Sequence, residues 1–204
     1  MSEVATVPLA LDDFVPVLLA GVGSLLLSGV VPREQRTPAR TGAVLILAGG
    51  LCKAGWKLTL AVTGHDEAWV ADLLFVLLAP GFTLLAWGLL AARGRSLVPA
   101  VPAGVIVLAG LLAAGLQATW PLLVLTVVTS TATGVLALLL ARDRGDHLAM
   151  VLFGVQLVMA YALVPLAGTG QSIAHQWWEQ SLNTLGQGAF ALAASRLMNV
   201  RSYA

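Results

Sequence analysis

Seven apolar runs, each close to the length that crosses a lipid bilayer, fill most of this 204-residue chain. A helix of about 20 residues spans the hydrocarbon core, where only helices and closed barrels satisfy their backbone hydrogen bonds. The chain is 58% hydrophobic and 10% charged, against roughly a quarter charged in an average soluble domain. The sequence therefore predicts an all-α integral membrane protein, a bundle of seven transmembrane helices. The runs lie at about residues 13–31, 42–63, 68–92, 97–116, 120–141, 148–167 and 174–197.

Short linkers join the runs, so we expect residues 1–204 to form a single seven-span membrane domain. The N-terminal segment MSEVATVPLALDD has no basic region before the first run, which predicts that this run is retained and not cleaved as a signal peptide. A net charge of +1 with no basic patch argues against nucleic acid as a partner. We expect a multi-pass protein of the cell (plasma or inner) membrane, with membrane lipid as one partner.

The arginines predict the orientation of the bundle. All of them follow the first, third or fifth run or lie at the C-terminal end of the seventh, whereas the loops between the other runs contain neither lysine nor arginine. Because cytoplasmic loops carry the excess of positive charge, the N-terminus is predicted to lie outside and the C-terminus in the cytoplasm. The arginines are Arg33, Arg36, Arg40, Arg93, Arg95, Arg142, Arg144, Arg196 and Arg201.

Both lysines of the chain lie within the second run. An ammonium group at the centre of a bilayer costs about 2.5–3.5 kcal/mol on insertion scales, so Lys53 and Lys57 need compensation. Being four residues apart, they share one face of a helix. Reflection of the chain through a turn between Gly64 and His65 places Asp72 opposite Lys57, and we expect these two to form an ion pair. Lys53 has no such partner and is expected to face polar groups of the last run.

Those polar groups form a stripe on the seventh run. His175, Glu179, Asn183 and Gln187 follow one another at spacings of four, so they share a helix face that must meet protein or water within a membrane. Reflection through the last outer turn places Tyr161 opposite Glu179. We therefore predict a polar chamber in the outer half of the bundle, although the same groups could serve only to join the helices. The candidate ligand-binding residues are Lys53, Lys57, Asp72, Gln156, Tyr161, Glu179, Asn183 and Gln187.

The fourth run, VPAGVIVLAGLLAAGL, has no polar side chain and is expected to face lipid between two three-helix halves. A weak sequence similarity between the two halves of the chain favours such a 3+1+3 pseudo-repeat. Trp69 and Phe82 are thirteen residues apart, as are Trp177 and Phe190. Repeats related about the membrane normal occur in small transporters.

Several cofactor-dependent functions lack their residues. The last run has no lysine for a retinal Schiff base, and no histidines lie deep enough in the membrane to hold a haem. His65 and His175 share a side of the membrane but form no close histidine cluster, so we expect no metal site and no cofactor. Cys52 is single and is expected to act as a small buried hydrophobe.

Three functional interpretations remain open. The first is a small transporter, or a solute- or lipid-binding protein, whose chamber binds a small or amphipathic molecule. The second is a membrane-embedded enzyme that acts on a lipid or isoprenoid by acid–base chemistry, with Asp72 or Glu179 as the acid and a lysine setting its pKa. The third is an accessory subunit that stabilises a larger complex by binding another membrane protein.

Overall fold

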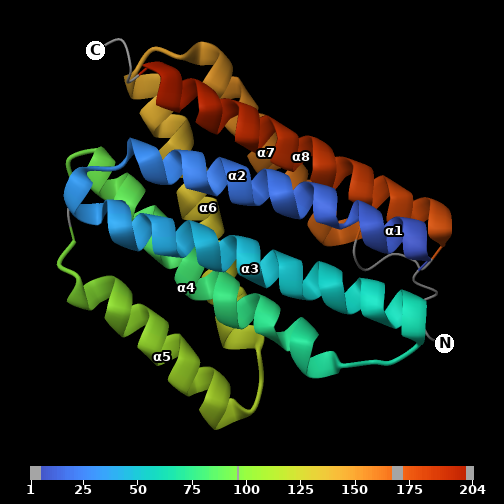
Figure 1. Ribbon diagram of the computed structural model, residues 1–204. Coiled ribbons are helices and arrows are strands. Elements are labelled where there is room, and N and C mark those ends of the chain that lie inside the picture. The colour runs from blue at the N-terminus through green and yellow to red at the C-terminus, as the bar shows by residue number, and fades with distance from the viewer. Residues whose placement is uncertain (1–5, 96, 167–171, 201–204) are drawn as a thin grey trace.

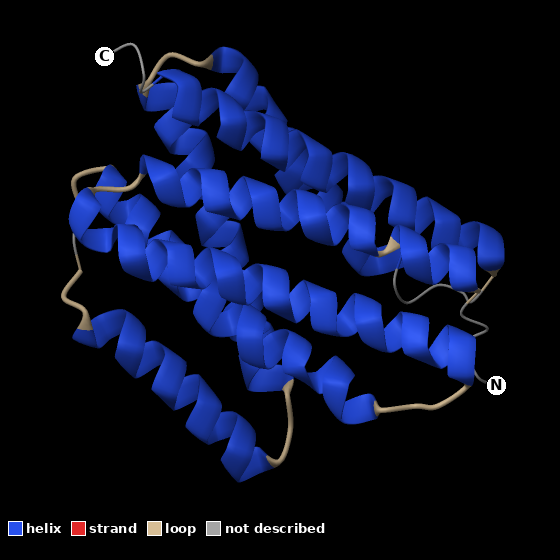
Figure 2. Ribbon diagram, viewed as in Figure 1, coloured by secondary structure: helices blue, strands red, loops and turns tan. Residues whose placement is uncertain are grey.

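The computed structural model describes residues 6–95, 97–166 and 172–200, and within these ranges it contains helices and no strand (Figures 1 and 2). The helices are α1 (Val7–Asp12), α2 (Phe14–Val30), α3 (Arg33–Thr63), α4 (Ala68–Ala92), α5 (Ala100–Leu116), α6 (Trp120–Asp143), α7 (His147–Leu166) and α8 (Ile173–Val200). The first apolar run thus corresponds mainly to α2, which α1 precedes with a break at Asp13. The all-helical prediction is confirmed for the described residues.

Four helical segments among the described residues are long and apolar enough to cross a membrane. They are Val7–Val30, Arg33–Thr63, Ala68–Ala92 and Trp120–Asp143. Ala100–Leu116 and His147–Leu163 are shorter apolar helices. Helix α8 has 28 residues but carries the polar stripe, which lowers its hydropathy. These lengths and compositions agree with a helical membrane protein, and the number of spans stays a prediction.

The helices on either side of α5 make corresponding contacts. Helix α3 packs against α2 and α4, and α7 packs in the same way against α6 and α8. The two halves meet where α2 packs against α8 and where α6 packs against α4. Helix α5 lies at the edge of the bundle, where its main contacts are with α4 and α6 (Figure 1). That α5 faces lipid stays a prediction.

Helices α3 and α4 touch through glycine. A Cβ atom on Gly42 would lie 2.5 Å from the carbonyl oxygen of Gly81, so no side chain fits between the two backbones. Farther along, Gly49 lies against Leu74 and Leu77. Small residues at such contacts let helices approach closely, as they do in membrane bundles. The two contacts also fix which residues of α3 and α4 lie at the same level.

Ion pairs tie the helix ends together at the end of the bundle where the described arginines gather, which we call the arginine end (Figure 1, left and upper left). Arg93 after α4 contacts Asp143 at the end of α6, with 2.9 Å between Nε and Oδ2. Arg196 of α8 contacts Asp146, which precedes α7, at 3.1 Å. The dense apolar core lies towards this same end. Its large members include Leu27, Val31, Leu85, Leu89, Phe153 and Leu197, all less than 2% exposed.

Asp146 caps α7 at the arginine end. Its Oδ1 accepts a hydrogen bond from the Ala149 amide at 3.0 Å, and the residue is 7% exposed. Burial alone raises the pKa of this carboxyl, but the Ala149 amide, the Arg196 guanidinium and the Leu148 amide together hold the pKa below its ordinary value. The ionised carboxylate is thus the form that the folded protein stabilises.

Candidate functional site

A cavity of about 180 Å³ lies where the two lysines of α3 face the start of α2 and the middle of α8. We call it the lysine cavity. It brings together Lys53, Lys57 and Asn183, three of the residues that the sequence placed in a chamber. Its lining consists of Asp13, Val17, Gly50, Lys53, Ala54, Lys57, Leu74 and Asn183.

Lys57 forms an ion pair with Asp13, with 2.7 Å between Nζ and Oδ2. This corrects the predicted pair with Asp72. The contact of Gly49 with Leu74 and Leu77 puts Asp72 level with Lys53, about one turn away from Lys57. The predicted turn is instead an open loop over residues 64–67, and Figure 1 shows the first turns of α4 lying away from the end of α3. Asp72 is exposed and is not among the described side chains that line the cavity.

Asp13 is the site residue that sequence reasoning missed, because it stands at the very start of the first apolar run. The packing of α2 on α3 explains its position. Gly21 lies against Leu47 and Gly50 lies against Val17, and the same antiparallel register puts Asp13 opposite Ala54, between the two lysines. Reflection through the turn between α2 and α3 would have placed Asp13 within about one helical turn of Lys53.

Lys53 lines the same cavity, is exposed, and has no ion-pair partner among the described residues. Glu179, the other carboxylate predicted for the chamber, instead lies 3.3 Å from His175 on its own helix. The charged groups that line the lysine cavity in the described chain are therefore two ammonium groups and one carboxylate. Their sum is one positive charge.

A second cavity of about 180 Å³ lies between α2, α4, α6, α7 and α8, and we call it the central cavity. Gln156 and Gln187 both line it, from α7 and α8. Two phenylalanines, Phe82 and Phe190, close it from opposite halves of the chain. The complete lining is Ala20, Ser24, Phe82, Ser130, Thr133, Gly134, Gln156, Ala160, Gln187 and Phe190.

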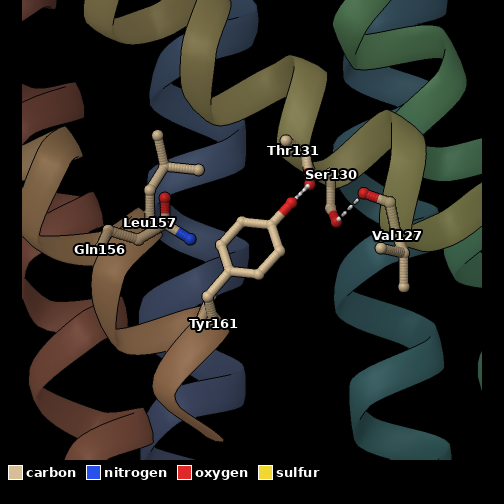
Figure 3. A pocket seen from close by; sticks show the side chains of 7 residues that line it. Val127, Ser130, Thr131, Gln156, Leu157 and Tyr161 are labelled. Carbon is tan, nitrogen blue, oxygen red and sulfur yellow. Dashed lines mark hydrogen bonds between the residues drawn. The ribbon is translucent and has the colours of Figure 1, made fainter. Parts of the chain in front are cut away.

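A side cavity of about 120 Å³ shares Ser130, Gln156 and Ala160 with the central cavity and adds Tyr161 (Figure 3). The Tyr161 hydroxyl and the Thr131 hydroxyl are 2.7 Å apart and share a hydrogen bond between α7 and α6. Tyr161 therefore has Thr131 as its partner, which corrects its predicted position opposite Glu179. Reflection through the last outer turn compared α7 only with α8, whereas the partner of Tyr161 lies on α6.

Two polar atoms beside the central cavity lack a hydrogen-bond partner in the described structure. They are Ser24 Oγ and Gln156 Oε1, and Ser24 is 1% exposed. A buried polar group without a partner costs about 1–3 kcal/mol, so such groups are nearly always satisfied by protein, water or a bound molecule. The cavity next to these atoms is the place from which a partner can come.

The two cavities occupy neighbouring levels of the bundle. Asn183 lines the lysine cavity and Gln187, one turn further along α8, lines the central cavity. On α2 the lining passes in the same way from Val17 to Ser24. Towards the arginine end, the apolar core begins at Phe190, whose ring packs edge-on against Phe153 at 5.9 Å between centroids. The polar groups thus occupy the part of the bundle away from the arginines.

A larger, apolar groove of about 450 Å³ separates the peripheral α5 from α4 and α6. The Trp87 indole N–H donates a hydrogen bond to the Leu97 carbonyl oxygen at 3.0 Å at its edge. The rest of the lining is Thr83, Ala86, Leu90, Val101, Pro102, Val105, Thr129, Ala132, Val135 and Leu136.

The described residues contain no group of three or more His, Cys, Asp or Glu side chains that could hold a metal ion. Comparison with family models, with curated proteins and with solved structures finds no match to this chain. The two polar cavities are the features of the described chain that point to a function.

Proposed function

We propose that α2 to α8 form seven membrane spans, with α1 leading into the first, the N-terminus outside and the arginine end in the cytoplasm. The gathering of the arginines at one end supports this orientation, because positive residues are retained on the cytoplasmic side. Four helical segments among the described residues have the length and apolar composition of membrane spans. In this orientation the lysine cavity lies in the outer half of the membrane.

We also propose a 3+1+3 layout, in which α2–α4 and α6–α8 are related halves and α5 connects them. The matching helix contacts within and between the halves support it. So does the central cavity, to which Phe82 and Phe190 contribute from corresponding places in the two halves. Small transporters bind their substrates between such repeats, near the middle of the membrane.

We infer that the protein binds a small or amphipathic molecule in a chamber formed by the lysine cavity and the central cavity. It would do so as a small transporter or as a solute- or lipid-binding protein. The observation that carries the proposal is the pair of unpartnered buried atoms, Ser24 Oγ and Gln156 Oε1, beside the central cavity. They come from α2 and α7, one from each half. A bound polar group would satisfy them and would link the halves.

The enzyme interpretation has less support from the geometry. Glu179 is engaged with His175, and Asp72 lies on an exposed face, so neither proposed acid lines the cavities in the described chain. The carboxylate that does line a cavity, Asp13, is paired with Lys57. A binding or transport function requires only the polar lining that is present.

The test is to identify molecules that remain bound to the purified protein in a mild neutral detergent, by mass spectrometry of intact complexes. We expect a retained molecule in the wild type, and its loss in Gln187→Leu and Asn183→Leu, because each change replaces a cavity amide with an apolar group. Gln176→Leu is the matched control, since Gln176 lies on α8 and does not line either cavity. Equal retention in all four proteins, or none in the wild type, would contradict the proposal.

A further inference from the structure

The residues that line the lysine cavity in the described chain carry a net charge of one positive unit. Lys57 and Asp13 neutralise one another, with 2.7 Å between Nζ and Oδ2, whereas Lys53 forms no ion pair with a carboxylate of the described chain. An ammonium group inside a membrane protein requires a counter-charge or water. An anion in the cavity would bring its total charge to zero.

We propose, on the basis of the binding function above, that the lysine cavity is a subsite for a singly charged carboxylate or phosphate group. The Lys53 ammonium is its direct contact, and the Asn183 side-chain amide is a second hydrogen-bond donor. The anionic group belongs either to a small organic anion or to a lipid headgroup. The remainder of the molecule extends towards the central cavity.

The size of the cavity agrees with such a group. Sites for drug-sized ligands occupy about 300–1,000 Å³, and the lysine cavity has about 180 Å³. It therefore holds one end of a molecule. The polar wall along α8, from Asn183 to Gln187, leads from this end to the central cavity of similar volume.

Side chains on two sides of the lysine cavity can position an anion. The Lys57–Asp13 pair holds the start of α2 against α3 on one side of the cavity, and Asn183 faces it from α8. Lysine is a compact charge with three donors on a flexible stem, so it recognises either a carboxylate or a phosphate. Hydrogen bonds that involve a charged group are stronger than neutral ones, so Lys53 should dominate the affinity.

The experiment measures binding to the full-length protein in nanodiscs of uncharged phosphatidylcholine, by isothermal titration. The probes are decanoate, decanol and decyltrimethylammonium, which share a chain and differ in charge, together with inorganic phosphate. We expect decanoate to bind more tightly than decanol and the cation to bind least. Lys53→Gln should weaken decanoate binding about ten- to a hundredfold, the range of one charge-assisted hydrogen bond, and leave decanol unchanged.

Lys53→Arg is the matched variant that keeps the charge, and it should retain most of the affinity for decanoate. Asp13→Asn raises the charge of the cavity and should strengthen decanoate binding in the fraction of protein that remains folded. Native mass spectrometry after addition of phosphatidylglycerol to the nanodiscs separates the two sources. Retention of phosphatidylglycerol by the wild type and its loss in Lys53→Gln would show that the bound anion is a lipid headgroup. Tight binding of decanoate or phosphate, without retention of phosphatidylglycerol, would show that it is a free anion.

Two results separate a failure of this inference from a failure of the proposed function. Equal binding of decanoate and decanol, with both lost in Gln187→Leu, would refute the anion subsite and leave the chamber in place. Absence of binding of every probe and of any co-purified molecule would overturn both. An unchanged decanoate affinity in Lys53→Gln would by itself refute the role of Lys53.

Discussion

The ion pair between Lys57 and Asp13 should make a measurable contribution to stability, because it joins the start of α2 to the end of α3. The two side chains are 27% and 17% exposed, which is partial burial. Exposed pairs contribute about 0–1 kcal/mol, and removal of one partner from a buried pair costs about 3–5 kcal/mol. Lys57→Met should therefore lower the free energy of unfolding by about 2 kcal/mol, since it leaves the Asp13 carboxylate without its counter-charge.

The assay is thermal unfolding of the detergent-solubilised protein, followed by circular dichroism. For a chain of this length, about 2 kcal/mol corresponds to a fall in Tm of about 4–8 °C. Asp13→Asn combined with Lys57→Met should recover part of the loss, because no charge is then left unpaired, giving a coupling of about 1–2 kcal/mol. The reasoning is refuted if Lys57→Met costs the same with and without Asp13→Asn, or if Asp72→Asn is the change that suppresses its cost.

Two further predictions concern the arginine end and the orientation. The orientation is tested in a Cys52→Ala background with a membrane-impermeant maleimide. Thr37→Cys should react only after the membrane is opened, whereas His65→Cys should react in intact cells. The opposite pattern would contradict the predicted orientation. Asp146→Ala removes the cap of α7 and the partner of Arg196, which should cost about 2 kcal/mol. Because the pKa of the Asp146 carboxyl in the folded protein lies below its ordinary value of 3.8, the stabilisation that this group provides is complete above about pH 5. It is lost as the pH falls below 3.8 towards the folded pKa. The Tm of wild type should therefore approach that of Asp146→Ala on acidification, and a constant difference down to about pH 2 would count against this interpretation.

The positions of the helices could be predicted because long apolar runs and turn residues mark them directly. The third run was placed at 68–92, and α4 occupies the same residues. Gly64 adopts a positive φ of 70° after α3, as the end of a helix often requires. The start of α3 was placed about nine residues late, because hydropathy reports burial in lipid and the polar first turns from Arg33 are helical without being apolar.

The pairing of side chains was harder to predict, because it depends on the register between helices. The predicted partner of Lys57 assumed a tight turn, and the open loop at 64–67 shifts the register by about one turn. Periodicity alone correctly placed Lys53 and Lys57 on one face. The stripe on α8 is divided in the structure, with Asn183 in the lysine cavity, Gln187 in the central cavity and Glu179 beside His175.

The most direct test of a ligand-binding chamber is a single-particle structure of the protein in lipid nanodiscs, at a resolution that shows side chains and bound molecules. We predict non-protein density that continues from the lysine cavity into the central cavity. This density should lie within about 3.5 Å of Lys53 Nζ, Ser24 Oγ or Gln156 Oε1. A structure in which these atoms are satisfied by other protein groups, with the central cavity closed and Lys53 extended to the membrane surface, would contradict it.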